Sequence, residues 1–372
     1  MINPYMAACI QPVVHMCETR NDIKKNLERY KELIDYTVGY YWEYPCKLIA
    51  FPEYFLQGVT TPGKGEKKRG AFLDVAIEIP GKEIEELGNK AKEYGIYIAG
   101  GGIVERLPDF PEYWFNAGII VGPKGNVILK YHKWHIPAWL GLGTSPHDVF
   151  DRYKELFGGN LKTLFPIADT EIGKLGIFIC YDGYTPEVAR ALAFNGGEVL
   201  VHSTAQPCDL IEGTNDVWTV TNRARAHDNM VYILAPNWGR VEYKYYPENF
   251  CPGRSQIIDF HGRIIAEAPY PGESVIGAII DIEALRRTRT MVTWNYWADL
   301  RAEVFKEIYE NPIYPPNLFI EHPPESLSQK VEGEIQAFEY LYKKGTFTRP
   351  SGHVPTVAER IKEAQARGVL KK

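Results

Sequence analysis

The sequence predicts a layered α/β fold between residues 5 and 285. Short apolar runs alternate there with amphipathic stretches, and Gly, Pro and Asn punctuate the turns between them. Hydrophobic residues make up 45% of the 372 positions and charged residues 24%, so the chain carries enough apolar material to bury a sizeable core. Together these observations predict alternating strands and helices around a hydrophobic interior.

Helical periodicity begins at Ile23, because apolar residues recur every three or four positions from there to Ile34. Asn21 and Asp22 stand immediately before this stretch, where a short polar side chain can cap the first turn. The apolar run at residues 47–51 then predicts a short buried strand. The first predicted unit is therefore a helix that leads into a strand.

A second helix is predicted over residues 82–94, and Gly95 ends it because glycine adopts the left-handed conformation at a helix C-terminus most readily. Apolar runs separated by Gly, Pro and Asn follow directly. They predict consecutive strands over residues 96–104, 115–121 and 127–133.

A second alternating block starts with a predicted strand over residues 175–179. Thr185 and Pro186 then supply an N-cap and a proline at the first helical position, which predicts a helix over residues 186–195. The remaining elements are a strand over 198–203, a helix over about 214–229, a strand over 231–236 and a hairpin around His261 and Gly262.

The composition changes at about residue 286, where aromatic residues precede one helical stretch and several prolines then interrupt the regular pattern. We therefore predict one domain over residues 1–285 and a C-terminal extension over residues 286–372. An irregular, aromatic-rich segment of this kind suits an arm that packs on the core or on a neighbouring subunit, and a loosely ordered tail is the alternative.

Charge and cysteine usage exclude several classes of function. The net charge is −5 and the basic residues are scattered, so no basic face is available for nucleic acid. Neither a signal peptide nor a run of roughly 18 apolar residues is present, which predicts a cytoplasmic protein that binds no membrane. The cysteines form no CxxC pair, and His132 and His135 lack a matching pair of ligands, so no metal site is predicted.

Three short strings each place a reactive side chain just after an apolar strand, where active-site residues of open α/β sheets gather. They are FPEYFLQG with Glu53, KYHKWHIP with Lys133 and FICYDGYTPE with Cys180. Taken singly, such residues are usually a strand-end carboxylate, a solvated lysine and an inert buried thiol. Their joint occurrence favours catalysis.

Acyl transfer from an amide needs a nucleophile, a base that ionises it, and donors where negative charge develops on the carbonyl oxygen. Cys180, Glu53 and Lys133 supply these three groups. Cys180 stands at a turn that leads into a helix, and both the helix N-terminus and a nearby lysine would favour its thiolate.

With these strings the sequence resembles the nitrilase superfamily of carbon–nitrogen hydrolases, over residues 5 to about 285. Within it, FPEYFLQG, ICYDGYTPE and the long extension look most like the aliphatic amidase and formamidase branch. The resemblance implies a four-layer α-β-β-α sandwich of the nitrilase type, with a C-terminal extension. It also implies a homo-oligomer built from stacked dimers. Further strings that carry the resemblance are Asn116 to Gly122, Arg223 to Ala226, Asn237 to Gly239 and Gly253 to Ser255.

The resemblance further implies a mechanism for hydrolysing a small non-peptide amide to a carboxylic acid and ammonia. Glu53 would take the proton of Cys180, and the thiolate would form a thioester, while Lys133 and the backbone N–H of Tyr181 hold the oxyanion. Neither a metal nor an organic cofactor is implied. The alternatives are an N-carbamoyl amidohydrolase or a nitrilase with the same three residues, and a catalytically idle binding subunit.

Amidases of this branch carry a second glutamate shortly after the lysine, whereas residues 134–145 contain no acid here. Asp148, Asp151 and Glu155 are candidates to replace it, and Glu155 is preferred as the only glutamate of the insertion. Residues expected to line the substrate pocket, from their positions beside the strings and at the end of the next strand, are Tyr54, Trp139, His202, Ser203 and Thr204.

Overall fold

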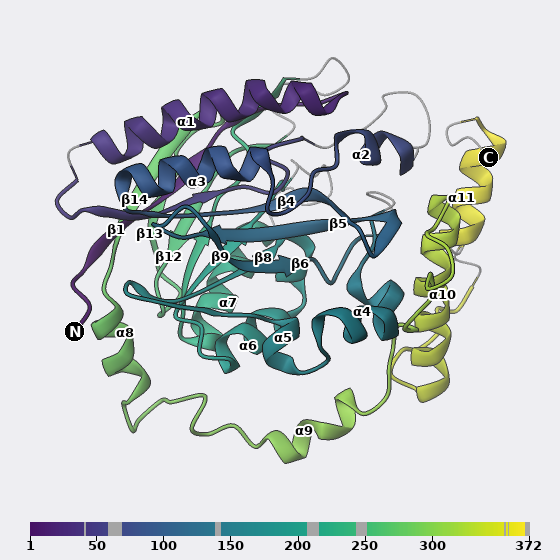
Figure 1. Cartoon of the computed structure of the whole chain (residues 1–372). Coiled ribbons are helices and arrows are strands. Elements are labelled where there is room, and N and C mark those ends of the chain that lie inside the picture. Colours follow the sequence, from purple (N-terminus) through teal and green to yellow (C-terminus); the bar gives the residue numbers. More distant parts are fainter. Residues whose placement is uncertain are drawn as a thin grey trace.

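Two β-sheets pack face to face in the computed structural model of the chain, and helices cover both outer faces (Figure 1). The predicted four-layer α-β-β-α sandwich is confirmed. The structure describes residues 1–40, 42–58, 69–137, 143–206, 216–242, 251–352, 355 and 357–368.

The first sheet has the strand order β14-β1-β3-β4-β5-β6. Its central strands β1, β3 and β4 run parallel, whereas β14, β5 and β6 pair antiparallel with their neighbours. β5 begins five residues before the predicted strand, as one arm of a long hairpin with β4. The strands are β1 (Tyr5–Gln11), β3 (Cys46–Phe51), β4 (Tyr97–Leu107), β5 (Phe110–Val121), β6 (Val127–His132) and β14 (Ser274–Ile280).

The second sheet has the order β13-β12-β10-β9-β8-β7, with β8, β9 and β10 parallel. Apolar side chains of both sheets, among them Ala50 and Ile179, fill the space between them. Its strands are β7 (Ala168–Thr170), β8 (Gly173–Ile179), β9 (Val199–Ser203), β10 (Tyr232–Ala235), β12 (Gln256–Ile258) and β13 (Ile264–Glu267), and a separate parallel pair joins β2 (Val13–His15) to β11 (Arg240–Glu242).

Helices α1 (Ile23–Gly39) and α3 (Lys82–Tyr94) cover the first sheet, and α6 (Pro186–Phe194) and α7 (Val217–Asn229) cover the second. α3 has its predicted bounds, and Gly95 ends it with φ 62°. α1 continues five residues beyond the predicted apolar stretch, to Gly39. Shorter helices are α2 (Arg69–Val75), α4 (Phe150–Phe157) and α5 (Leu161–Leu164).

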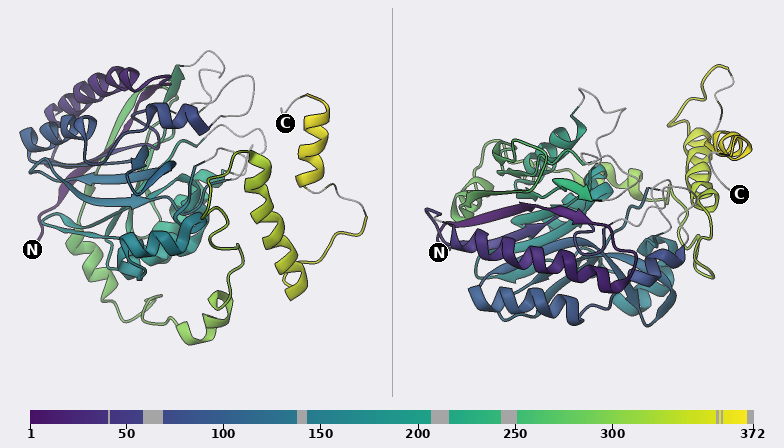
Figure 2. Two further views of the ribbon diagram at one scale, coloured as in Figure 1. Left: turned by 45° about the vertical axis from the view of Figure 1, so that its right-hand side comes forward. Right: turned by 90° about the horizontal axis from the view of Figure 1, so that it is seen from above.

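The C-terminal extension leaves the sandwich after α8 (Ile282–Arg289) and contains more than the single helical stretch expected. It holds α9 (Ala302–Tyr309), α10 (Leu327–Lys344) and α11 (Val357–Ala366). Ser326 caps α10 by accepting a hydrogen bond from Gln329 N, and Gly345 ends it with φ 76°. α10 runs beside the sandwich at the end where α4 lies (Figure 1), and both views of Figure 2 show the helix outside the two sheets.

Candidate active site

Three strand ends bring Glu53, Lys133 and Cys180 into one buried cluster. Glu53 follows β3 and Lys133 follows β6, both in the first sheet, whereas Cys180 follows β8 in the second. The exposed fractions of the three residues are 2%, 4% and 7%, so their charges interact across a medium that excludes most water.

The carboxylate of Glu53 is held from two sides. Lys133 Nζ donates to Glu53 Oε1 at 2.7 Å, and Asn116 Nδ2 donates to the same oxygen at 2.8 Å. Trp238 Nε1 also donates to the backbone oxygen of Glu53 at 2.6 Å. Burial alone would lower the pKa of Lys133, but electrostatic interactions with Cys180 and Glu53 outweigh burial and raise that pKa above its usual range, so the lysine stays cationic.

Cys180 opens the tight turn Cys180–Tyr184 with φ 48°, a left-handed conformation that non-glycine residues rarely adopt. Burial, followed by the charge of Glu53, raises the pKa of its thiol to about 12, although Lys133 acts in the opposite direction. Lys133 thus favours the thiolate, as expected, but burial and the charge of Glu53 outweigh it and keep the pKa of Cys180 raised. The thiol keeps its proton near neutral pH, and a hydrogen bond links it to Glu53.

Asp182 joins the nucleophile turn to the segment that carries the lysine. Its carboxylate accepts from Tyr131 OH at 2.7 Å and from His135 N at 2.9 Å, and these residues flank Lys133 on both sides. The Asp182 side chain is fully buried. Its position straight after Cys180 and Tyr181 was the sequence signal that could have identified this supporting role.

His202 supports the nucleophile turn from beneath. Its Nε2 lies 2.9 Å from Cys180 O and its Nδ1 lies 2.6 Å from Asn222 Oδ1. Burial lowers the pKa of His202, so the ring is neutral and its single N–H is the one that Cys180 O can accept. A half-turn of the Asn222 amide would let Nδ2, which has no partner among the described residues, donate to Nδ1.

Ser203 and Thr204 likewise hold the protein's own backbone. Ser203 Oγ donates to Phe51 O at 2.5 Å and accepts from Gly101 N at 2.8 Å, and these bonds join the second sheet to the first. Thr204 Oγ1 donates to His202 O at 3.2 Å. The three residues predicted to line the pocket at the end of β9 are thus buried supports, and these contacts do not favour direct contact with substrate.

The structure does not bring Glu155 to the cluster, because this residue is exposed on α4. The preference for Glu155 over Asp148 therefore finds no support here, since Asp148 is the buried acid of the insertion. Tyr54 lies beside Glu53 and Cys180, and burial followed by their charges raises its pKa. Trp139 lies outside the described residues.

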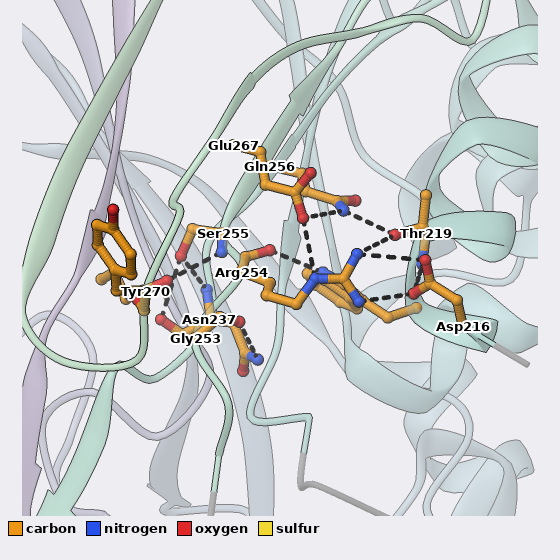
Figure 3. Close-up of polar contacts among 11 residues, drawn as sticks. Asp216, Thr219, Asn237, Gly253, Arg254, Ser255, Gln256, Glu267 and Tyr270 are labelled. Carbon is orange, nitrogen blue, oxygen red and sulfur yellow. Dashed lines mark hydrogen bonds and ion pairs between the residues drawn. The ribbon is translucent and has the colours of Figure 1, made fainter. Parts of the chain in front are cut away.

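A polar network connects Asp216, Asn237 and Arg254 beside the second sheet (Figure 3). Arg254 donates to Asp216 Oδ1 at 2.8 Å and to Glu267 Oε1 at 2.9 Å. Asn237, the neighbour of Trp238, donates to Gly253 O at 2.8 Å. The network thereby holds Trp238, which donates to Glu53 O. In the sequence, residues 237–239 stood out only as one of the strings that carry the family resemblance, and their contact with Glu53 was not predicted.

The sequence comparisons agree with this geometry. The profile of the family described as carbon-nitrogen hydrolase matches residues 6–290. The chain belongs to the carbon–nitrogen hydrolase family. It is 31% identical over 271 residues to a formamidase of Bacillus cereus, covering 72% of this chain and 70% of the relative, and a formamidase of Bacillus anthracis matches equally well. The predicted membership of the nitrilase superfamily, and of the hydrolases that act on carbon–nitrogen bonds as amidases, is confirmed.

Solved structures of this carbon–nitrogen hydrolase fold superpose on most of the chain. A carbon-nitrogen hydrolase from Helicobacter pylori G27 aligns with a TM-score of 0.65 at 21% identity, covering 82% of this chain and 99% of its own. Nit3 of Saccharomyces cerevisiae, a member of branch 10 of the nitrilase superfamily, aligns with a TM-score of 0.61 at 24% identity, covering 80% and 97%.

The described residues hold no candidate metal cluster and no candidate membrane span. Among them no group of three or more His, Cys, Asp or Glu side chains is arranged to hold a metal ion. None of the helices in the described ranges combines the length and the apolar character needed to cross a bilayer.

Proposed function

We propose that this carbon–nitrogen hydrolase cleaves a small non-peptide amide to a carboxylic acid and ammonia through a thioester on Cys180. The observation that supports the proposal most directly is the buried contact between Glu53, Lys133 and the thiol. A base, a cation and a nucleophile that converge in one dry site are the groups that acyl transfer requires.

In the first half-reaction the Cys180 sulfur attacks the amide carbon as Glu53 takes the thiol proton. Burial and the charge of Glu53 raise the pKa of the thiol, so the resting sulfur carries a proton and needs a base to remove it. The carbonyl oxygen becomes an oxyanion, which the Lys133 ammonium and the Tyr181 N–H stabilise. The first N–H groups of a helical turn have no partner within that turn, so the Tyr181 N–H is suited to this role.

The first half-reaction ends when Glu53 gives its proton to the departing nitrogen, which leaves as ammonia, and Glu53 is then a carboxylate again. In the second half-reaction water hydrolyses the thioester. Glu53 takes a proton from the incoming water, whose oxygen attacks the acyl carbon, and the carbon–sulfur bond breaks as the acid departs. The sulfur regains a proton from Glu53, which restores the resting state.

The substrate class follows from the relatives. The formamidases at 31% identity favour amides with few carbon atoms as the first compounds to examine.

We also propose a homo-oligomer, supported by exposed apolar side chains on the outer helices α6 and α7, such as Phe194 with an exposed fraction of 67% and Val220 with 61%. Light scattering of the full chain measures its mass, and a monomer would contradict this part.

Ammonia release from a panel of short aliphatic amides, N-carbamoyl compounds and nitriles tests the function. We expect turnover of at least one amide, and a loss of at least about a thousandfold in Cys180→Ala. Cys46→Ala is the matched control, because Cys46 is also a buried cysteine but lies at the start of β3. Retained activity in Cys180→Ala would reject the mechanism, whereas turnover of carbamoyl compounds or nitriles alone would favour the alternative activities.

A further inference from the structure

Asp148 and Lys330 form an ion pair that is buried on both sides. Lys330 Nζ lies 2.5 Å from Asp148 Oδ2, and the side chains are 4% and 2% exposed. Asp148 belongs to the turn Pro146–Val149 after the lysine string, whereas Lys330 lies in the first turn of α10, in the extension. Removing two charges from water is costly, and loss of one partner leaves the other buried and unpaired.

A continuous chain of hydrogen bonds connects this pair to the catalytic lysine. Asp148 Oδ2, the oxygen that Lys330 binds, also accepts from Ser145 N at 2.9 Å. Ser145 Oγ in turn donates to Trp134 O at 2.5 Å. Trp134 is the residue directly after Lys133, so each link from α10 to the lysine is a short polar contact or a covalent bond.

The backbone of the extension binds the same turn. Phe319 N donates to Asp148 O at 3.0 Å, and Asn317 N donates to His147 O at 2.9 Å. The Lys330 ammonium also lies 5.1 Å from the centre of the Phe319 ring, a cation–π distance. The turn that carries Asp148 is therefore fixed by main-chain and side-chain contacts from the extension.

The extension also comes close to the nucleophile. Glu334 follows Lys330 by one helical turn and lies on the same face of α10. After burial, the charge of Glu334 is the next cause that raises the pKa of Tyr181, the residue that follows Cys180. The Glu334 carboxylate is therefore close enough to the Tyr181 phenol to interact with it electrostatically.

We propose that Lys330, acting through Asp148, is a positioning residue for Lys133, and that the C-terminal extension is thereby a structural part of the active site. This proposal rests on the proposed function for its kinetic consequences. The ion pair holds Ser145, Ser145 holds the Trp134 carbonyl, and the lysine is kept within reach of Glu53 and of the developing oxyanion.

Lys330→Met and the double variant Asp148→Asn/Lys330→Met separate positioning from plain stability. The single variant leaves a buried carboxylate unpaired, so we expect its melting temperature to fall. The double variant removes both charges and should recover most of that temperature. We expect kcat to stay reduced by about tenfold to a hundredfold in both, with KM changed less than kcat, because a displaced lysine stabilises the oxyanion poorly.

Lys343→Met is the matched control, because Lys343 is also a lysine of α10 but is exposed in the last turn of that helix. We expect a change in kcat below about twofold for this surface substitution. Recovery of kcat in the double variant in parallel with its melting temperature would overturn the proposal, because activity would then follow folding alone.

A second measurement needs no amide substrate. Lys133 lowers the pKa of Cys180, so a displaced lysine should move the alkylation of Cys180 by iodoacetamide to higher pH in the double variant. An unchanged alkylation profile would count against positioning. If the wild type cleaves nothing in the panel, the proposed function fails, while this profile still decides whether Lys330 positions Lys133.

Discussion

Gly102 packs so tightly against Tyr54 that a Cβ at residue 102 would lie 1.9 Å from Tyr54 N and 2.5 Å from Glu53 Cγ. Gly102 lies on β4 with φ 72°, so it also has a backbone conformation that side chains disfavour. The backbone of the first sheet therefore leaves room for Glu53 only because residue 102 has no side chain.

Gly102→Ala should abolish most activity, because the added methyl group has to displace the backbone that carries Glu53. Gly95→Ala is the control, since Gly95 has φ 62° but a Cβ added there would meet no atom within 4 Å. We expect Gly95→Ala to cost about 1–2 kcal/mol through backbone strain alone, with kcat nearly unchanged. Thermal unfolding and ammonia release measure the two effects, and equal losses in both variants would refute a steric role for Gly102.

Glu53→Gln should change alkylation and turnover in opposite directions. The Glu53 charge raises the pKa of Cys180, so its removal lowers that pKa and should speed alkylation by iodoacetamide at pH 8 by about tenfold or more. Turnover should fall by at least about a hundredfold, because the base is lost.

Intact mass after timed labelling gives the alkylation rate of Glu53→Gln, and Cys180→Ala reports the background from the other cysteines. Slower labelling of Glu53→Gln than of the wild type would contradict the electrostatic account of the resting thiol.

Asp182→Asn should destabilise the fold more than Tyr131→Phe. The carboxylate of Asp182 is fully buried and accepts several hydrogen bonds, so its loss should cost about 3 kcal/mol of unfolding free energy. Tyr131→Phe removes one of these bonds and should cost about 1.5 kcal/mol. Urea unfolding measures both values, and the reverse order would show that Asp182 does not join the two segments.

His202 should make the fold less stable in acid. Burial lowers its pKa in the folded chain, so below about pH 6.5 the unfolded chain binds a proton that the folded chain does not. The effect of His202 on the free energy of unfolding is absent above that pH. Below it, the free energy of unfolding falls by up to about 1.4 kcal/mol per pH unit. Urea unfolding between pH 5 and 7 should show a smaller decline in His202→Gln than in the wild type. An unchanged slope would show that His202 does not cause the loss of stability in acid.

Much of the sandwich was predictable because local signals agreed with the tertiary packing. α3 begins and ends as expected, since its apolar face and Gly95 both specify it. The prediction of one helical stretch in the extension missed α10, although Ser326 and Gly345 cap the two ends of that helix in the usual way. The prolines before α10 suggested that the whole extension was irregular, so this helix of 18 residues was not predicted.

The convergence of Glu53, Lys133 and Cys180 was predictable from three strand ends, but the raised pKa of Cys180 was not. Its pKa depends on how completely the fold buries the sulfur and on the distance to Glu53, and neither quantity is local in sequence. The same limit applies to His202 and Ser203. Their side chains bind backbone groups of residues distant in sequence, so their supporting roles appear only once the sheets are packed together.

Two hydrogen bonds of Ser203, to Phe51 O and from Gly101 N, connect the two sheets, and they can form only after the sheets have docked. The base and the lysine belong to one half of the sandwich and the nucleophile to the other. A chain with only one sheet formed would show native-like circular dichroism for that half and have no reactive centre. During refolding, activity should therefore appear no earlier than the docking of the two sheets.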